Sequence, residues 1–180
     1  MRLFIGLPLS GAATENTAAL AARAQERIPG RYVPAFNYHL TLAFLGEVSE
    51  QQLASAKSAL DAFVARFPAP RMTLCGLSYF SRPSNAILIR TAECEDDLFS
   101  MRGALLDTLT AQALPFTDGP FSSHVTLARH ADTTHTPPES VPFSPVRFMA
   151  PHAVLYLSAR NEHNILRYTP LHSVPFRIFP

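Results

Sequence analysis

Cysteine and lysine are the scarcest of the functional side chains in this sequence. The two cysteines, Cys75 and Cys94, lie far apart and outside any C-x-x-C pair, which argues against a disulfide framework and against a thiol-bound zinc. All of the basic residues except Lys57 are arginine, and they are scattered along the chain. The formal net charge is only +1. No global field therefore attracts a polyanion, and any recognition of phosphate must be local.

Several sequence signals for other classes of protein are also missing. No apolar run approaches the length that spans a membrane, and Pro8 interrupts an N-terminal apolar stretch too short for a signal peptide. There is no Walker loop, no glycine-rich dinucleotide fingerprint and no G-x-S-x-G elbow. We expect a cytoplasmic protein that needs no cofactor.

The hydrophobic content of 47% over 180 residues is enough for a substantial core, and one domain is the default for this length. Periodicity and turn residues predict strands and helices in an order typical of an α+β protein with mainly antiparallel sheet. The expected strands cover residues 2–8, 39–45, 71–80, 85–91, 123–129, 153–158 and 167–174. The expected helices cover residues 10–28, a segment opening at the capping-box residues Ser49 and Gln52, and residues 95–112.

Two segments of the chain repeat one motif 85 residues apart. They read HLTLAFLG from His39 and HVTLARHA from His124. Side chains two apart on a strand share a face, so each histidine is expected to project with the threonine that follows it, Thr41 or Thr126. Two related lobes facing each other would explain the repeat and would bring both histidines to one cleft.

This pairing suits chemistry at phosphorus. In-line displacement needs a base at the attacking oxygen and an acid at the departing one, and His39 and His124 can serve both roles near neutral pH. Thr41, Thr126 and a cation such as Arg129 could hold the non-bridging oxygens without a metal. Strict alternation would send Arg129 to the opposite face unless a bulge turns it back. At the matching place after His39, Phe44 is expected in the core.

At this point the sequence resembles the RNA 2′,3′-cyclic phosphodiesterases, also called 2′,5′-RNA ligases, of the two-histidine phosphoesterase superfamily. The resemblance covers nearly the whole chain and rests on the segments RLFIGLPL, NYHLTLAFLGEVS, PFSSHVTLAR and RYTPL. It implies a single two-lobed domain over residues 1–180, with two mainly antiparallel sheets flanked by helices and a central cleft. It also implies hydrolysis of a terminal 2′,3′-cyclic phosphate to a 2′-phosphomonoester, with His39 as proton donor and His124 as proton acceptor.

The expected partners are RNA ends or nucleotides that bear a 2′,3′-cyclic phosphate, bound by a monomer. Ser123 stands where relatives often have proline, Gly119 replaces a common arginine, and Tyr32 replaces a common tryptophan. Three alternatives stay open. The first keeps the fold but changes the reaction to small cyclic nucleotides, ADP-ribose cyclic phosphate or reversible 2′,5′ joining of RNA ends. The second is a nucleotide- or RNA-end-binding module without turnover, and the third is a structural protein with two coincidental motifs. Intact histidines argue against a pure binding module, because binding alone requires no titratable pair.

Overall fold

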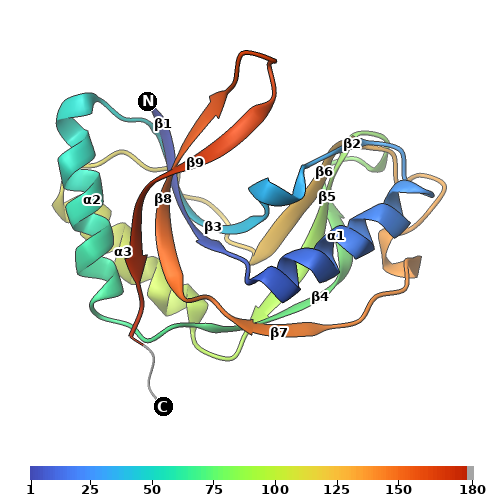
Figure 1. Cartoon of the computed structure of the whole chain (residues 1–180), viewed down its shortest axis with the longest axis horizontal. Coiled ribbons are helices and arrows are strands. Elements are labelled where there is room, and N and C mark those ends of the chain that lie inside the picture. The colour runs from blue at the N-terminus through green and yellow to red at the C-terminus, as the bar shows by residue number, and fades with distance from the viewer. Residues whose placement is uncertain (178–180) are drawn as a thin grey trace.

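A computed structural model describes residues 1–177, in which nine strands form one curled sheet (Figure 1). The strands are β1 (Arg2–Pro8), β2 (Arg31–Tyr32), β3 (His39–Glu47), β4 (Arg71–Phe80), β5 (Ala86–Cys94), β6 (His124–Ala131), β7 (Val146–Met149), β8 (His152–Arg160) and β9 (Leu166–Pro175). Their order is β7-β4-β5-β6-β3-β1-β8-β9, with β2 paired to β6. All the strand pairings are antiparallel.

The expectation of two separate sheets is corrected by the pairing of the two motif strands. β3 and β6 meet through a single residue pair, Leu40 opposite Val125, and this pair makes the sheet continuous. The α+β class and the antiparallel pairing were predicted correctly. A bilobal character survives within the one sheet, because β2, β4, β5, β6 and β7 lie on one side of this narrow junction and β1, β3, β8 and β9 on the other.

Within residues 1–177, three α-helices cover the two halves of the sheet. They are α1 (Gly11–Gln25), α2 (Glu50–Val64) and α3 (Leu98–Ala111). Helices α2 and α3 pack together beside β8, β9 and β3, while α1 lies over the other half, next to β7 (Figure 1). Leucine, alanine and phenylalanine side chains of the helices and sheet form one buried core. None of the described helices is long and apolar enough to cross a membrane.

Most of the predicted elements are confirmed with small shifts of boundary. The third helix begins at Leu98 rather than Glu95, because the Asp97 side chain caps it by accepting from Ser100 N at 3.0 Å. Strands β2 and β7 were missed, since two and four residues are too short to establish a period. The segment between β6 and β7 contains a 3₁₀ turn at Pro138–Ser140.

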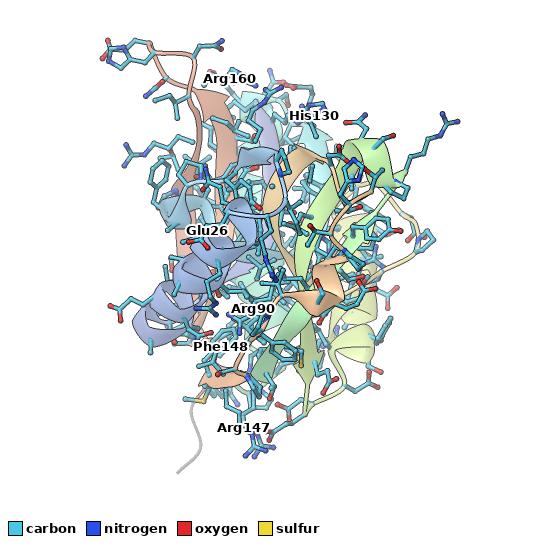
Figure 2. All side chains as sticks on the ribbon, turned by 90° about the vertical axis from the view of Figure 1, so that its right-hand side faces the viewer. Glu26, Arg90, His130, Arg147, Phe148 and Arg160 are labelled. Carbon is cyan, nitrogen blue, oxygen red and sulfur yellow. The ribbon has the colours of Figure 1, made fainter. Side chains whose placement is uncertain are left out.

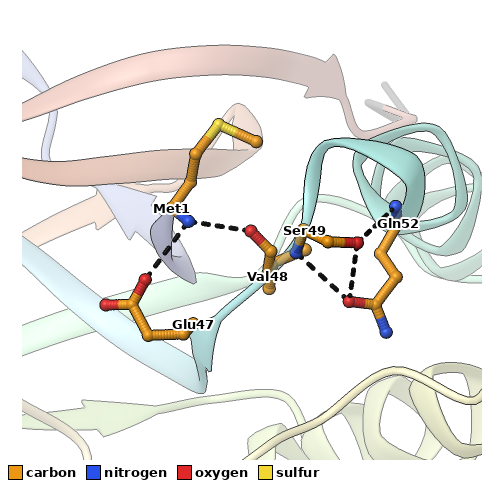
Figure 3. A network of polar contacts seen from close by, with 5 residues as sticks. All are labelled: Met1, Glu47, Val48, Ser49 and Gln52. Carbon is orange, nitrogen blue, oxygen red and sulfur yellow. Dashed lines mark hydrogen bonds and ion pairs between the residues drawn. The ribbon is translucent and has the colours of Figure 1, made fainter.

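The link from β3 to α2 is fixed by a local network of polar contacts (Figure 3). Ser49 Oγ accepts from Gln52 N at 3.2 Å, and Gln52 Oε1 accepts from Ser49 N at 3.2 Å, so the predicted capping box is present. The Met1 ammonium donates to Val48 O at 2.8 Å and lies 3.2 Å from Glu47 Oε2. These contacts join β1, the end of β3 and the start of α2.

A fully buried arginine ties together the half of the sheet that carries β6. Arg90 of β5 donates to Cys75 O at 3.0 Å, to Thr17 Oγ1 of α1 at 2.9 Å and to Ser144 O at 3.0 Å. Burial lowers the pKa of Arg90 to about 10, so the group remains charged at neutral pH. Its three acceptors come from three separate segments, and removal of Arg90 would leave all three without this donor.

Candidate active site

The two histidines stand on either side of a local twofold axis. Leu40 follows His39 and Val125 follows His124, and these two residues form the antiparallel pair that joins β3 to β6. Extending this register by one residue sets His39 across from Thr126 and Thr41 across from His124. The side chains of such neighbours lie on one face of the sheet. The repeat seen in the sequence is therefore a structural symmetry.

These residues open into one cavity of about 680 Å³. His39, Thr41, His124, Thr126 and Arg129 all line it, so the structure brings the whole predicted set together. Phe80 and Tyr168 are also in the wall and offer aromatic faces on which a base could stack, whereas Phe121 packs instead against Phe99 and under Arg102.

A bulge in each motif strand explains why Arg129 lies in the cavity. On β6, Thr126 and Ala128 face consecutive residues of β5, so Leu127 is an extra residue. On β3, Leu42 is the extra residue between two consecutive partners on β1. Because each bulge shifts the alternation by one residue, Phe44 and Arg129, five residues after the two histidines, face the cleft. The expectation that Phe44 packs in the core was therefore wrong: it is 47% exposed and lines the cavity.

The carbonyl groups of both bulge residues find donors outside their own sheet ladder. Leu42 O accepts from Arg102 Nε of α3 at 3.1 Å, and Leu127 O accepts from Val33 N at 2.8 Å. A bulge carbonyl that lacks a ladder partner needs such a donor if it is buried. Arg102 thus supports the shape of β3 from the helical side of the sheet.

Both histidines are oriented by the carbonyl group two residues earlier. His39 Nδ1 lies 2.7 Å from Asn37 O, and His124 Nδ1 lies 2.7 Å from Ser122 O. A carbonyl oxygen can only accept, so each Nδ1 carries the proton and each neutral ring has its Nε2 free of hydrogen. His39 Nε2 is 3.0 Å from Thr41 Oγ1, which donates to the neutral ring.

Burial shifts the two histidines in the same direction. The pKa of His39 is lowered to about 4, mainly by burial and with smaller contributions from the charges of His124 and Arg129, while the hydrogen bond to Asn37 O opposes the shift. Burial also lowers the pKa of His124, with a smaller contribution from Arg129. The His39 ring contacts Phe4, with centroids 4.7 Å apart, and Tyr168, at 5.0 Å edge-on. Both rings are therefore neutral near pH 7 when the cavity holds no anion.

Asn37 and Gly6 position His39, and the sequence analysis did not identify either. The buried Asn37 side chain donates to Leu166 O at 2.8 Å and accepts from Tyr168 N at 3.1 Å, which ties the segment before His39 to β9. A Cβ on Gly6 would stand 2.7 Å from Leu40 O and 3.2 Å from His39 Cδ2. Only glycine lets β1 approach β3 this closely. In the sequence, the only signals for these two roles were the asparagine two residues before His39 and a glycine within the first predicted strand.

The departures from the family pattern have different structural consequences. Ser123 Oγ is buried and is the one such side-chain atom in residues 1–177 without a hydrogen-bond partner. Gly119 has open space around its Cβ position and does not line the cavity. In the part of the chain that the structure describes, no three His, Cys, Asp or Glu side chains gather as metal ligands.

Comparison with known proteins agrees with this geometry. Residues 7–88 match the family model described as LigT like phosphoesterase. The chain is 31% identical over 176 residues to an RNA 2′,3′-cyclic phosphodiesterase of Escherichia coli, covering 94% of this chain and 93% of the relative. It is 35% identical over 150 residues to a protein of the same name from Thermus thermophilus, covering 77% and 73%. The chain belongs to the LigT-like phosphoesterase family.

The same family includes longer proteins and solved structures. The chain spans 51% of the length of an RNA 2′,3′-cyclic phosphodiesterase of Geobacillus stearothermophilus, with 28% identity over 159 residues. The crystal structure of TT0787 from Thermus thermophilus covers 99% of both chains with a TM-score of 0.78 and 25% identity. Escherichia coli LigT in complex with 3′-AMP covers 97% of this chain and 96% of that one, with a TM-score of 0.65 and 27% identity.

Proposed function

We propose that this protein hydrolyses the 2′,3′-cyclic phosphate at the end of an RNA to a 2′-phosphomonoester. The observation that carries the proposal is the twofold arrangement of His39 and His124 in one cavity. Each has its Nδ1 proton held by a carbonyl group, and each has a threonine hydroxyl two residues away. The names of the relatives, and a LigT structure that holds 3′-AMP, support the choice of a nucleotide phosphoester.

In the proposed reaction, His124 Nε2 removes a proton from water as the water oxygen attacks phosphorus. The bond from phosphorus to the 3′ oxygen breaks, and His39 Nε2 delivers a proton to that oxygen. The product carries a 2′-phosphate and a free 3′ hydroxyl group. Thr41, Thr126 and Arg129 line the same cavity and can donate to the non-bridging oxygens as charge develops there. Exchange with solvent returns His39 to the charged form and His124 to the neutral form.

The hydrogen bonds of the two rings are consistent with this division of roles. Within residues 1–177, His124 Nε2 makes no hydrogen bond, and a neutral nitrogen in this state is ready to accept a proton from water. His39 Nε2 is held by Thr41 Oγ1, so the ring keeps its aim whether it accepts or donates. As the acid, His39 must be protonated although the free site lowers its pKa. The negative charge of the bound phosphate opposes this effect and raises the pKa of His39.

The test is product analysis with two substrates, an oligonucleotide that ends in a 2′,3′-cyclic phosphate and 2′,3′-cyclic AMP. The expected product is the 2′-phosphate, formed also after exhaustive chelation of metals. His39→Asn and His124→Asn should abolish turnover. His130→Asn is the matched control, since His130 lies outside the cavity and asparagine tolerates its φ of 52°. Binding without product would favour a nucleotide-binding module, and a 3′-phosphate product would contradict the proposed bond cleavage.

A substrate with sulfur in place of the departing 3′ oxygen separates the two histidines. Sulfur leaves readily without a proton, so His39→Ala should recover most of its rate on this analogue. His124→Ala should remain impaired on both substrates, because the attacking water still lacks a base. Recovery of His124→Ala instead would reverse the assigned roles.

A further inference from the structure

A second cavity of about 350 Å³ continues the candidate active site away from the histidines. Arg129, Arg160 and Tyr168 belong to the walls of both cavities, so the two volumes adjoin. Arg31 lines the second cavity alone. Figure 2 shows Arg160 at the same end of the molecule as His130, the residue that follows Arg129 on β6. The cleft therefore extends from the reacting groups along an arginine-lined path.

Two of these arginines face each other on neighbouring strands. Arg31 of β2 and Arg129 of β6 are cross-strand partners in one of only two residue pairs that β2 makes. Like charges in directly opposed positions on antiparallel strands destabilise the pairing. Neither guanidinium lies within ion-pair distance of a carboxylate within the described part of the chain. An anion bound between them would relieve this repulsion.

The charge of the cleft contrasts with that of the whole molecule. Among the described residues, four arginines line the two cavities and no aspartate or glutamate does. The complete chain has a net charge of only +1, so the acidic side chains lie elsewhere. A local concentration of positive charge in a nearly neutral protein indicates recognition of more than one phosphate group.

The far wall of the second cavity is made by the β8–β9 hairpin, which projects from the sheet (Figure 1). Arg160 Nη1 donates to Asn164 O at 2.7 Å, so the guanidinium is held against the hairpin turn. Ile165, beside Asn164, is 47% exposed and lines the cavity. The cavity thus offers an apolar contact for a base beside the cationic contacts for a phosphate.

We propose that the second cavity binds the nucleotide that precedes the terminal one, with the phosphate that links the two nucleotides held by Arg31 and Arg160. Arg129 belongs to the walls of both cavities, so it lies between this linking phosphate and the reacting phosphate and can contact both. This inference rests on the proposed function. It assigns an RNA end of at least two nucleotides as the preferred substrate over a cyclic mononucleotide, which has no phosphate to reach the arginine pair. Arg31 is then a specificity-determining residue that does not touch the reacting phosphate.

The test compares kcat/KM on adenosine 2′,3′-cyclic phosphate with kcat/KM on the dinucleotide ApA that ends in the same group. The wild type should prefer the dinucleotide, and Arg31→Ala should reduce that preference by about tenfold, the value of one hydrogen bond from a charged group. Arg147→Ala is the matched control. It removes the same charge from an exposed arginine of β7 at the opposite end of the molecule (Figure 2), and should leave the preference intact.

A dinucleotide with an uncharged methylphosphonate linkage makes the test specific for the upstream phosphate. The wild type should lose its preference on this substrate, and Arg31→Ala should cause no additional loss. The proposal is overturned if the wild type does not prefer the dinucleotide, or if Arg31→Ala weakens turnover of both natural substrates equally.

Failure of the proposed function gives a different result. In that case neither cyclic phosphate is hydrolysed by the wild type, and the second cavity is tested by equilibrium binding of ApA with a 3′-phosphate. Weaker binding by Arg31→Ala than by Arg147→Ala would support the upstream site, whereas equal affinities would overturn it.

Discussion

The protonation of His39 provides the sharpest test of the candidate active site. With its pKa lowered to about 4, the ring carries a proton in only about one molecule in a thousand at pH 7. An ordinary histidine would be charged in about a quarter of the molecules. His39 can act as a proton donor only when protonated, so we expect the bound substrate to raise its pKa.

The negative charge of a bound phosphate is sufficient to raise the pKa of His39 back toward neutrality. One negative charge about 4 Å from the ring contributes about 4 kcal/mol at an effective dielectric constant near 20, which corresponds to about three pH units. That shift would return the pKa of His39 to near neutrality. It would also offset the charges of Arg129 and His124, which lower the pKa of His39 in the free protein.

Nuclear magnetic resonance titration of the histidine side chains measures this directly. His39 is assigned by the signal that disappears in His39→Gln, and its pKa is followed with and without 2′-AMP. We expect a value near 4 in the free protein and a rise of about two to three pH units in the complex. The exposed His135, which lines neither cavity, provides the internal control, and its resonance should not move when the ligand is added.

The same shift predicts the behaviour of rate and stability. The optimum of kcat/KM, which reports the free enzyme, should lie at lower pH than the optimum of kcat. Folding depresses the pKa of His39, so the unfolded chain binds more protons and stability falls as the pH drops from about 6.5 toward 4. His39→Asn should weaken this dependence. An ordinary pKa in the free protein, or no response to 2′-AMP, would refute the reasoning.

Four other predictions follow from individual contacts. Thr41→Ala and Thr126→Ala should each lower turnover by about one to three orders of magnitude with folding retained, as measured by steady-state kinetics and circular dichroism; full activity in both would assign the hydroxyls to packing. Gly6→Ala should displace the His39 ring, which would lower kcat by about tenfold or more and shift the His39 resonance. Ser123→Ala should raise the melting temperature, because it removes a buried hydroxyl that has no partner; a lower melting temperature would mean that this hydroxyl is satisfied. Arg90→Ala should reduce the free energy of unfolding by about 3 kcal/mol or more in urea titrations, since a cavity and three deprived acceptors result, and a loss below about 1 kcal/mol would contradict that account.

The sequence by itself determined most of the elements and the presence of two matched motifs. Hydrophobic period and turn residues located β1, β4 and the helices closely, because these signals act within a few residues along the chain. Alternation on a strand also predicted that His39 and Thr41 share a face, and the internal repeat predicted that His124 and Thr126 do the same. All four residues reach one cavity.

Tertiary structure alone decided how the two halves join and what completes the site. The single Leu40–Val125 pair makes one sheet where two were expected, and no local pattern encodes a pairing between strands 85 residues apart. The bulge at Leu127 brings Arg129 into the cleft against strict alternation. Arg31 meets Arg129 only through a two-residue strand that is too short to have a period. These features depend on strand register and on contacts distant in sequence, which periodicity does not specify.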